Sequence, residues 1–179
     1  MKITICGFPG SGKGTASKAI SQKLNLQHYC AGDLRREAAK QRSMTLSEFN
    51  EWAESNPQEG DKLFDQQTKE IGVDEDNFIF DGRLAFYFIP DSIKIYLSCD
   101  VNEAAKRKFA SERIEERASS VDSLVHLMRK RVDSDKGRYE SLYNVQVYNM
   151  KDFDLVIDTT TMTPQEVLDQ IVSFVTHKA

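Results

Sequence analysis

One glycine-rich stretch near the start of the chain organises the rest: Gly7-Phe8-Pro9-Gly10-Ser11-Gly12-Lys13-Gly14-Thr15. It follows a short apolar run, residues 3–6, and it opens a helical pattern with apolar residues on one face. A strand, a glycine-rich turn and a helix with Lys in its first turn are the context of a phosphate-binding loop. The glycines let backbone N–H groups converge on a phosphate, and the positive end of the helix dipole strengthens that field. The stretch therefore predicts a site for the phosphates of a nucleoside triphosphate, with Lys13 supplying a full positive charge.

The loop departs at one place from the general P-loop pattern, G-x-x-x-x-G-K-[ST]. The last position of the pattern holds Gly14, and the hydroxyl follows at Thr15. We expect Thr15 to serve a Mg²⁺ ion, either directly or through a water molecule. The local form G-x-P-G-x-G-K-G-T is similar to the loop of nucleoside monophosphate kinases, adenylate kinases especially. A glycine-rich turn that binds nothing is the alternative, and the agreement of motif and context disfavours it.

The bulk composition narrows the class of protein. The chain has 179 residues, with 24 Lys and Arg against 28 Asp and Glu. This balance gives no support to binding of nucleic acid or membrane, so an anionic ligand needs a local cluster of basic residues. We expect no signal peptide, because Met1 leads directly into the first predicted strand. No apolar run approaches the roughly 20 residues of a membrane span. Three scattered cysteines suggest buried free thiols. We expect a single-domain, monomeric, cytoplasmic protein.

Five short apolar segments are predicted as β-strands, and helical patterns separate them. They are Lys2–Cys6, Gln27–Cys30, Asn77–Phe80, Ser92–Leu97 and Asp154–Ile157. Most are apolar on both faces, as expected of buried parallel strands joined by helices. The sequence thus predicts an α/β fold: a three-layer αβα core with a five-stranded parallel sheet.

A long helical crossover, residues 33–72, joins the second and third predicted strands. Thr45 followed by Glu48 is a capping box that starts one helix. A further helix spans about residues 58–71, with Leu63 among the residues expected to face inward. A crossover this long exceeds what a sheet needs, so we expect it to form a helical lobe that carries a binding site.

Charged side chains follow the third predicted strand, in Asp81-Gly82-Arg83. Ligands of open parallel sheets bind beyond the carboxyl ends of the strands. Asp81 and Arg83 are therefore expected at the same edge as the phosphate-binding loop. A surface ion pair between the two is the simpler alternative.

Residues 106–138 are rich in arginine. The arginines are Arg107, Arg113, Arg117, Arg129, Arg131 and Arg138. A solvated helix face is the simpler interpretation, and we keep it for Arg129 and Lys130. For the others we favour a mobile lid, at about residues 107–120, that closes over phosphates. Arg131 and Arg138 lie seven residues apart, which places them on one face of a helix.

The chain resembles the archaeal-type cytidylate kinases, a branch of the P-loop nucleoside monophosphate kinases, over nearly its whole length. The stretches that carry the resemblance are Ala31-Gly32-Asp33 with Arg36, Met44-Thr45-Leu46-Ser47-Glu48-Phe49-Asn50, Asp81-Gly82-Arg83-Leu84-Ala85, Arg138-Tyr139 through Tyr143, and Leu155-Val156-Ile157-Asp158-Thr159. The resemblance implies a core, a nucleotide-binding lobe and a lid, with ATP as donor and CMP or dCMP as acceptor. Two departures are the Lys-Gly-Thr ending of the loop and Gly32-Asp33 where the family pattern has Gly-Glu.

Roles for the predicted site residues follow from the resemblance and from the chemistry of phosphoryl transfer. Transfer between two phosphates needs positioning and charge neutralisation more than a strong base. Residues 7–15 would bind the phosphates of ATP. Arg36 and Arg83 would hold the acceptor α-phosphate, because a guanidinium binds phosphate bidentately. The remaining assignments are Asp33, Asp81 and Gly82 to the acceptor site; Arg107, Arg131 and Arg138 to the transferring group; and Asp81, with Asp33 as a second candidate, to waters on Mg²⁺.

Two alternatives stay open. An adenylate kinase or a nucleoside monophosphate kinase of broader specificity is supported by Lys13-Gly14-Thr15. A non-catalytic nucleotide-binding regulatory protein is disfavoured, because a pure binder does not need Lys13, Asp81 and several arginines together. The residues that could read the acceptor base are Arg35, Glu37, Asn50, Asp61, Asp65 and Gln66.

Overall fold

A five-stranded parallel sheet forms the centre of the protein, in a computed structural model that describes residues 1–56, 59–111 and 118–178. The strands are β1 (Lys2–Gly7), β2 (Gln27–Cys30), β3 (Phe78–Asp81), β4 (Ile93–Ser98) and β5 (Leu155–Asp158), in the order β2-β3-β1-β4-β5. The five predicted strands are confirmed, each to within one residue. In the register of the sheet Ile5 lies opposite Asp81 of β3 and Cys6 lies opposite Tyr96 of β4. This register brings Asp81 to the end of β1, where the phosphate-binding loop begins.

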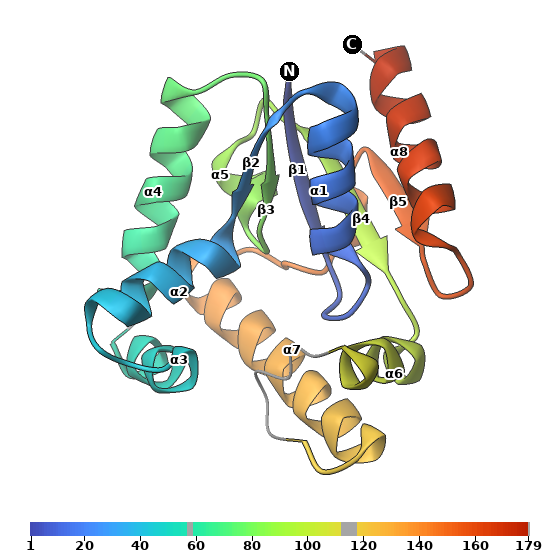
Figure 1. Ribbon diagram of the computed structural model, residues 1–179. Helices are drawn as coiled ribbons and strands as arrows, with labels where there is room; N and C mark the ends of the chain where they lie inside the picture. Colours follow the sequence, from blue (N-terminus) through green and yellow to red (C-terminus); the bar gives the residue numbers. More distant parts are fainter. Residues whose placement is uncertain (57–58, 112–117, 179) are drawn as a thin grey trace.

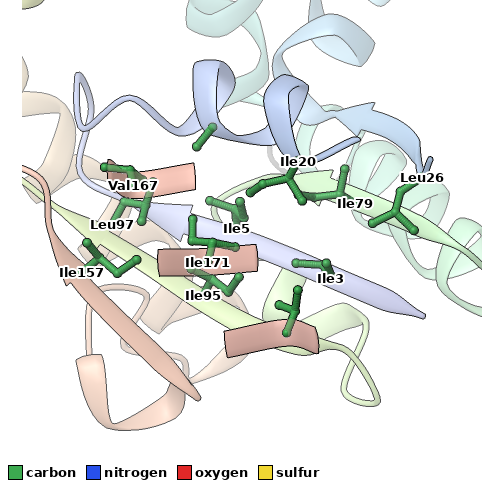
Figure 2. Close-up of a cluster of buried hydrophobic side chains, with 12 residues drawn as sticks. Ile3, Ile5, Ile20, Leu26, Ile79, Ile95, Leu97, Ile157, Val167 and Ile171 are labelled. Atoms are coloured by element: carbon green, nitrogen blue, oxygen red, sulfur yellow. The ribbon is translucent and has the colours of Figure 1, made fainter. Parts of the chain in front are cut away.

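Helices cover both faces of the sheet, which confirms the predicted three-layer arrangement (Figure 1). On one face α1 (Lys13–Leu24) and α8 (Pro164–Lys178) bury aliphatic side chains of β1, β3, β4 and β5. Figure 2 shows this cluster, which includes Ile3, Ile5, Ile20, Ile79, Ile95, Leu97, Ile157 and Ile171. Each fully buried side chain of this size stabilises the fold by about 1.5–3 kcal/mol.

The opposite face of the sheet packs against an aromatic cluster. Side chains alternate along a strand, so Cys6 points away from the Ile5 side. Cys6 and Tyr96 pack there against α5 (Ala85–Phe88) and the C-terminal end of α7 (Val121–Tyr143). Of the three cysteines only Cys6 is buried, whereas Cys30 and Cys99 are half-buried, which corrects the expectation of three buried thiols.

Three helices form the lobe between β2 and β3: α2 (Ala31–Gln41), α3 (Leu46–Ser55) and α4 (Gly60–Asp74). The capping box is confirmed: Thr45 Oγ1 accepts from Glu48 N at 3.2 Å, and Glu48 Oε2 accepts from Thr45 N at 2.7 Å. The prediction for Leu63 was wrong. Its side chain is 41% exposed, while Phe64 is 5% exposed, because one residue turns the side chain by about 100° around a helix axis.

Helix α6 (Val101–Ala110) packs against α7 through Ala104, Ala105, Leu124 and Met128. A short 3-10 helix, η1 (Met150–Asp152), precedes β5. Arg113 and Arg117, with most of the predicted lid turn, lie outside the described residues. Figure 1 shows α2, α3, α6 and α7 gathered at the end of the sheet where α1 begins. Within the described ranges, none of the helices combines the length and the apolar character that a membrane span requires.

Candidate active site

The phosphate-binding loop connects β1 to the first turn of α1. Gly7, Gly10 and Gly12 have φ values of 146°, 79° and 90°, which L side chains rarely adopt. A Cβ on Gly10 would lie 2.7 Å from the backbone oxygen of Ala104, so the loop also packs too closely for a side chain. Gly12 is the N-cap of α1 and has no side chain to accept from the first turn. The N–H groups of that turn can therefore donate to a bound anion.

Lys13 and Asp81 bring opposite charges to the carboxyl ends of β1 and β3. Lys13 Nζ donates to the backbone oxygen of Phe8 at 2.9 Å. Burial lowers the pKa of Lys13, and the carboxylate of Asp81 opposes that shift. Burial likewise raises the pKa of Asp81, and Lys13 opposes it. A Cβ on Gly14 would lie 3.6 Å from Asp81 Oδ2, so this carboxylate faces the first turn of α1.

Arg83 pairs with a buried carboxylate on α7 instead of with Asp81. Its Nη1 donates to Asp135 Oδ1 at 3.0 Å. Asp135 is 2% exposed, and it also accepts from Arg138 Nη2 and from the Tyr148 hydroxyl, each at 3.0 Å. Burial opposes the charge on Arg83, but Asp135 together with Tyr139 and Tyr148 outweighs burial and raises the pKa of the guanidinium. The surface pair of Asp81 with Arg83 is therefore not the arrangement in the structure.

A second buried carboxylate, Asp61 on α4, joins the lobe to this network. It is 1% exposed, and it pairs with Arg35 Nη2 at 2.5 Å and with Arg138 Nε at 3.2 Å. Arg35 Nη1 also donates to Asn50 Oδ1 at 3.3 Å. Arg138 thus lies between Asp61 of the lobe and Asp135 of α7. Its guanidinium ties these two parts of the protein together.

A pocket of about 260 Å³ opens between the lobe, the end of β3 and α7. Its lining residues are Arg35, Asn50, Arg83, Leu127, Lys130, Arg131, Ser134, Asp135 and Arg138. Five of them are basic and one is acidic, so the pocket suits an anionic ligand. The backbone oxygen of Arg83 accepts from Cys6 Sγ at 3.2 Å, directly before Gly7, so the pocket lies beside the phosphate-binding loop. The charges of Arg83 and Arg131 also lower the pKa of Lys13. A larger hollow of about 620 Å³, bordered by Phe86 and Lys94, shares no lining residue with this pocket.

Three predicted site residues, Arg36, Asp33 and Arg107, make contacts outside the pocket. Arg36 Nη2 pairs with Asp33 Oδ1 at 2.5 Å, and both side chains are exposed outside the pocket lining. Arg107 Nη2 donates to the backbone oxygens of Thr159 and Thr160, at 3.0 and 2.8 Å. Arg107 therefore holds the segment after β5 against α6.

The structure brings together most of the other predicted residues. Lys13, Asp81, Arg83, Arg131 and Arg138 gather around the loop and the pocket. Thr15 is exposed on the first turn of α1, and Gly82 is buried beside Phe80.

Sequence reasoning missed the role of Asp135. A signal was present, because Asp135 lies four residues after Arg131 and three before Arg138 on the same helix face. Arg35, Asn50 and Asp61 were candidates for reading a base, but their arrangement as one group was not predicted.

Oxygen atoms near the phosphate-binding loop could bind Mg²⁺, which prefers oxygen ligands. Asp81 and Thr15 offer a carboxylate and a hydroxyl near the first turn of α1. Among the residues that the structure describes, no group of three or more His, Cys, Asp or Glu could hold a metal ion alone. This fits an ion that takes most of its ligands from substrate phosphates and water.

The sequence is similar to a protein-family model and to curated proteins from several archaea. Residues 6–128 match a family model described as an AAA domain. A curated cytidylate kinase from Methanosphaera stadtmanae is 32% identical over 99% of both chains. Cytidylate kinases from Archaeoglobus fulgidus and Methanocaldococcus jannaschii are 34% and 35% identical, over 99% and 97% of this chain and 96% of each relative.

Solved structures of shikimate kinases share the fold. The enzyme from Bacteroides thetaiotaomicron superposes with a TM-score of 0.69 at 12% identity, covering 98% of both chains. The enzyme from Aquifex aeolicus gives 0.61 at 17% identity, covering 99% of this chain and 98% of that one. This likeness confirms the predicted core at the level of fold.

Proposed function

The chain belongs to the cytidylate kinase family, and we propose that it transfers the γ-phosphoryl group of ATP to CMP or dCMP, releasing ADP and CDP or dCDP. The family membership confirms the resemblance noted in the sequence. One observation supports the reaction above all others: a pocket with five basic lining residues adjoins the phosphate-binding loop. Two polyanions can therefore be held side by side, as transfer from one phosphate to another requires.

The donor phosphates belong in the loop. Its N–H groups and the N-terminal end of α1 face the same space, and Lys13 adds a full charge beside them. As the bond to the leaving phosphate breaks, negative charge moves toward the β-phosphate oxygens. Lys13 and the loop N–H groups are in place to stabilise that charge.

The acceptor phosphate belongs in the pocket. Its attacking oxygen is already anionic, so a strong general base is unnecessary. Arg83 and Arg131 line the pocket and their charges act on Lys13, so they can neutralise repulsion between the two substrates. Asp135 and Asp61 fix the directions of Arg83 and Arg35 before a substrate arrives. The predicted contact of Arg36 with the acceptor phosphate stays a prediction.

We include Mg²⁺ in the proposal. Asp81 and Thr15 would hold it directly or through water, and it would neutralise charge on the phosphate oxygens. The proposal also includes a short lid that closes over both substrates. Arg107, which lies in the described part of the chain, is a candidate residue of this lid.

The proposal is tested by a coupled assay of ADP formation with ATP and each of five acceptors: CMP, dCMP, UMP, dTMP and AMP. We expect the highest kcat/KM with CMP or dCMP. A preference for AMP would overturn the substrate assignment in favour of an adenylate kinase. Binding of ATP without turnover of any acceptor would support the regulatory alternative.

A further inference from the structure

Among the described residues, two side chains of α4 contact α7 and so tie the lobe to it. Asp61 pairs with Arg138 at 3.2 Å, at the edge of the acceptor pocket. Four residues further along α4, Asp65 Oδ2 accepts a hydrogen bond from the hydroxyl of Tyr143. Residues four apart lie on the same face of a helix, one turn from each other. Tyr143 is the last residue of α7, and it does not line the pocket.

The ring of Tyr143 is anchored in the core. It packs edge-on against Phe88 of α5, with ring centroids 5.3 Å apart, and it lies 6.0 Å from the ring of Tyr87. The ring belongs to the rim of the aromatic cluster under the sheet. Its hydroxyl reaches Asp65 of the lobe. Tyr143 therefore connects the rigid core to α4.

From Asp65 a series of contacts leads to the wall of the pocket. Asp61 follows one turn away on the same helix and pairs with Arg35 at 2.5 Å. Arg35 in turn donates to Asn50 at 3.3 Å, and both of these residues line the pocket. A change in the position of α4 must therefore move this wall relative to Arg83 and Arg138 on the other side.

Several charges act on Asp65. Burial raises the pKa of its carboxyl to about 6, and the like charge of Asp61 adds to the rise. The Tyr143 hydroxyl, Arg35 and Lys69 oppose it. A hydrogen bond to an ionised carboxylate is stronger than one to a neutral group. The bond from Tyr143 is thus strongest when Asp65 is ionised.

We propose that Tyr143 is a positioning residue for acceptor binding: by holding Asp65 it fixes α4, and with it the wall of Arg35 and Asn50, against the core. This inference rests on the proposed function, because acceptor use is its readout.

The test is Tyr143→Phe, which removes the hydroxyl and keeps the packed ring. At pH 8 we expect the KM for CMP to rise by about tenfold, the loss typical of a hydrogen bond to a charged group. The kcat and the KM for ATP should stay at the wild-type values, since the loop and Lys13 are untouched. Tyr87→Phe is the matched control: it removes a hydroxyl from the neighbouring ring, which is 43% exposed, and should change none of these constants.

The dependence on pH separates positioning from general structural damage. As pH falls below about 6, Asp65 becomes protonated and its bond to Tyr143 weakens in the wild type. The ratio of KM for CMP, variant over wild type, should therefore fall from about ten toward about one. Titration of the CMP phosphate affects both enzymes equally and cancels in the ratio. The double variant Tyr143→Phe/Asp65→Ala should be no worse than Asp65→Ala alone, because both changes break one interaction.

Three results would overturn the inference. The first is a Tyr143→Phe enzyme with the same KM for CMP as Tyr87→Phe at pH 8. The second is an equal loss for ATP and CMP together with a ratio that does not change with pH, which is the pattern of a purely structural role. The third is a wild-type protein that neither turns over nor binds CMP, which would overturn the proposed function as well and so differs from the other two.

Discussion

Arg83 and Asp135 lie 52 residues apart in the sequence, and their side chains meet at 3.0 Å where β3 faces α7. Asp135 is almost completely buried, with 3% of its side chain exposed. The side chain of Arg83 is 22% exposed, and it lines the pocket. A buried anion thus holds a cation that is partly open to a ligand. This arrangement fixes the direction of Arg83 before any phosphate binds.

Removal of Asp135 should destabilise the protein strongly. In Asp135→Ala both Arg83 and Arg138 lose a buried anionic partner. Removing one partner of a buried ion pair lowers the free energy of unfolding by about 3–5 kcal/mol. Urea denaturation measures the free energy of unfolding. Asp135→Asn keeps an oxygen acceptor and should lose less. Equal stability of wild type and Asp135→Ala would show that the network contributes little.

Lys13→Met should abolish turnover while leaving the fold intact. The side chain supplies charge to the donor phosphates, and loss of one such interaction lowers kcat by about 10²-fold or more. Burial already disfavours the charged amine, so thermal denaturation should show no loss of stability. Lys23→Met, on the exposed last turn of the same helix, is the control for the substitution itself. Near-normal turnover in Lys13→Met would contradict the assignment of Lys13 to the ATP phosphates.

Arg83→Ala should impair the acceptor far more than the donor. We expect the KM for CMP to rise by about 10- to 100-fold, equivalent to about 1.4–2.8 kcal/mol, with a small change in ATP binding measured by calorimetry. Arg36→Ala tests the other predicted phosphate ligand. Because Arg36 pairs with Asp33 outside the pocket lining, we expect a smaller rise. An equal loss of ATP and CMP binding in Arg83→Ala would contradict the assignment.

Asp65 should make the stability of the protein depend on pH. The pKa of this carboxyl is about 6 in the folded protein, against about 3.9 in an unfolded chain. Between these values the folded state binds more protons, so the free energy of unfolding should decrease as pH rises from about 4 to 6. Asp65→Asn cannot titrate. Its stability relative to wild type should therefore increase by about 2 kcal/mol across this window.

Urea denaturation at pH 4 and pH 7 measures this difference. Asp133→Asn, an exposed substitution on α7, is the control for the Asp-to-Asn exchange itself. If the difference between Asp65→Asn and wild type were the same at both pH values, the raised pKa of Asp65 would be contradicted.

Local features of this chain could be predicted because their causes lie within a few residues. The loop at residues 7–15 needs glycine where φ is positive, and the pattern of glycines is visible in the sequence. Thr45 and Glu48 are three residues apart, so their capping box follows from the helical geometry alone. The five strands were predicted for the same reason, since alternation and apolar runs are local.

The pocket that we propose for the acceptor depends on how elements distant in the sequence pack together. Asp61 meets Arg35 across 26 residues, and Tyr143 meets Asp65 across 78. Arg35 and Arg36 are neighbours in the sequence, but a turn of about 100° per residue directs only Arg35 into the pocket lining. The error at Leu63 has the same origin, because the rotation of α4 about its own axis depends on the elements that pack against it.

The sequence by itself determined the sheet, the phosphate-binding loop and the kind of chemistry at its edge. Only the tertiary structure decided which arginines line the pocket, and which buried carboxylates fix their directions. The physical reason is range: backbone conformation and helix capping act over about four residues, whereas the cost of burying a charge is met by whichever partner the packing of helices brings near.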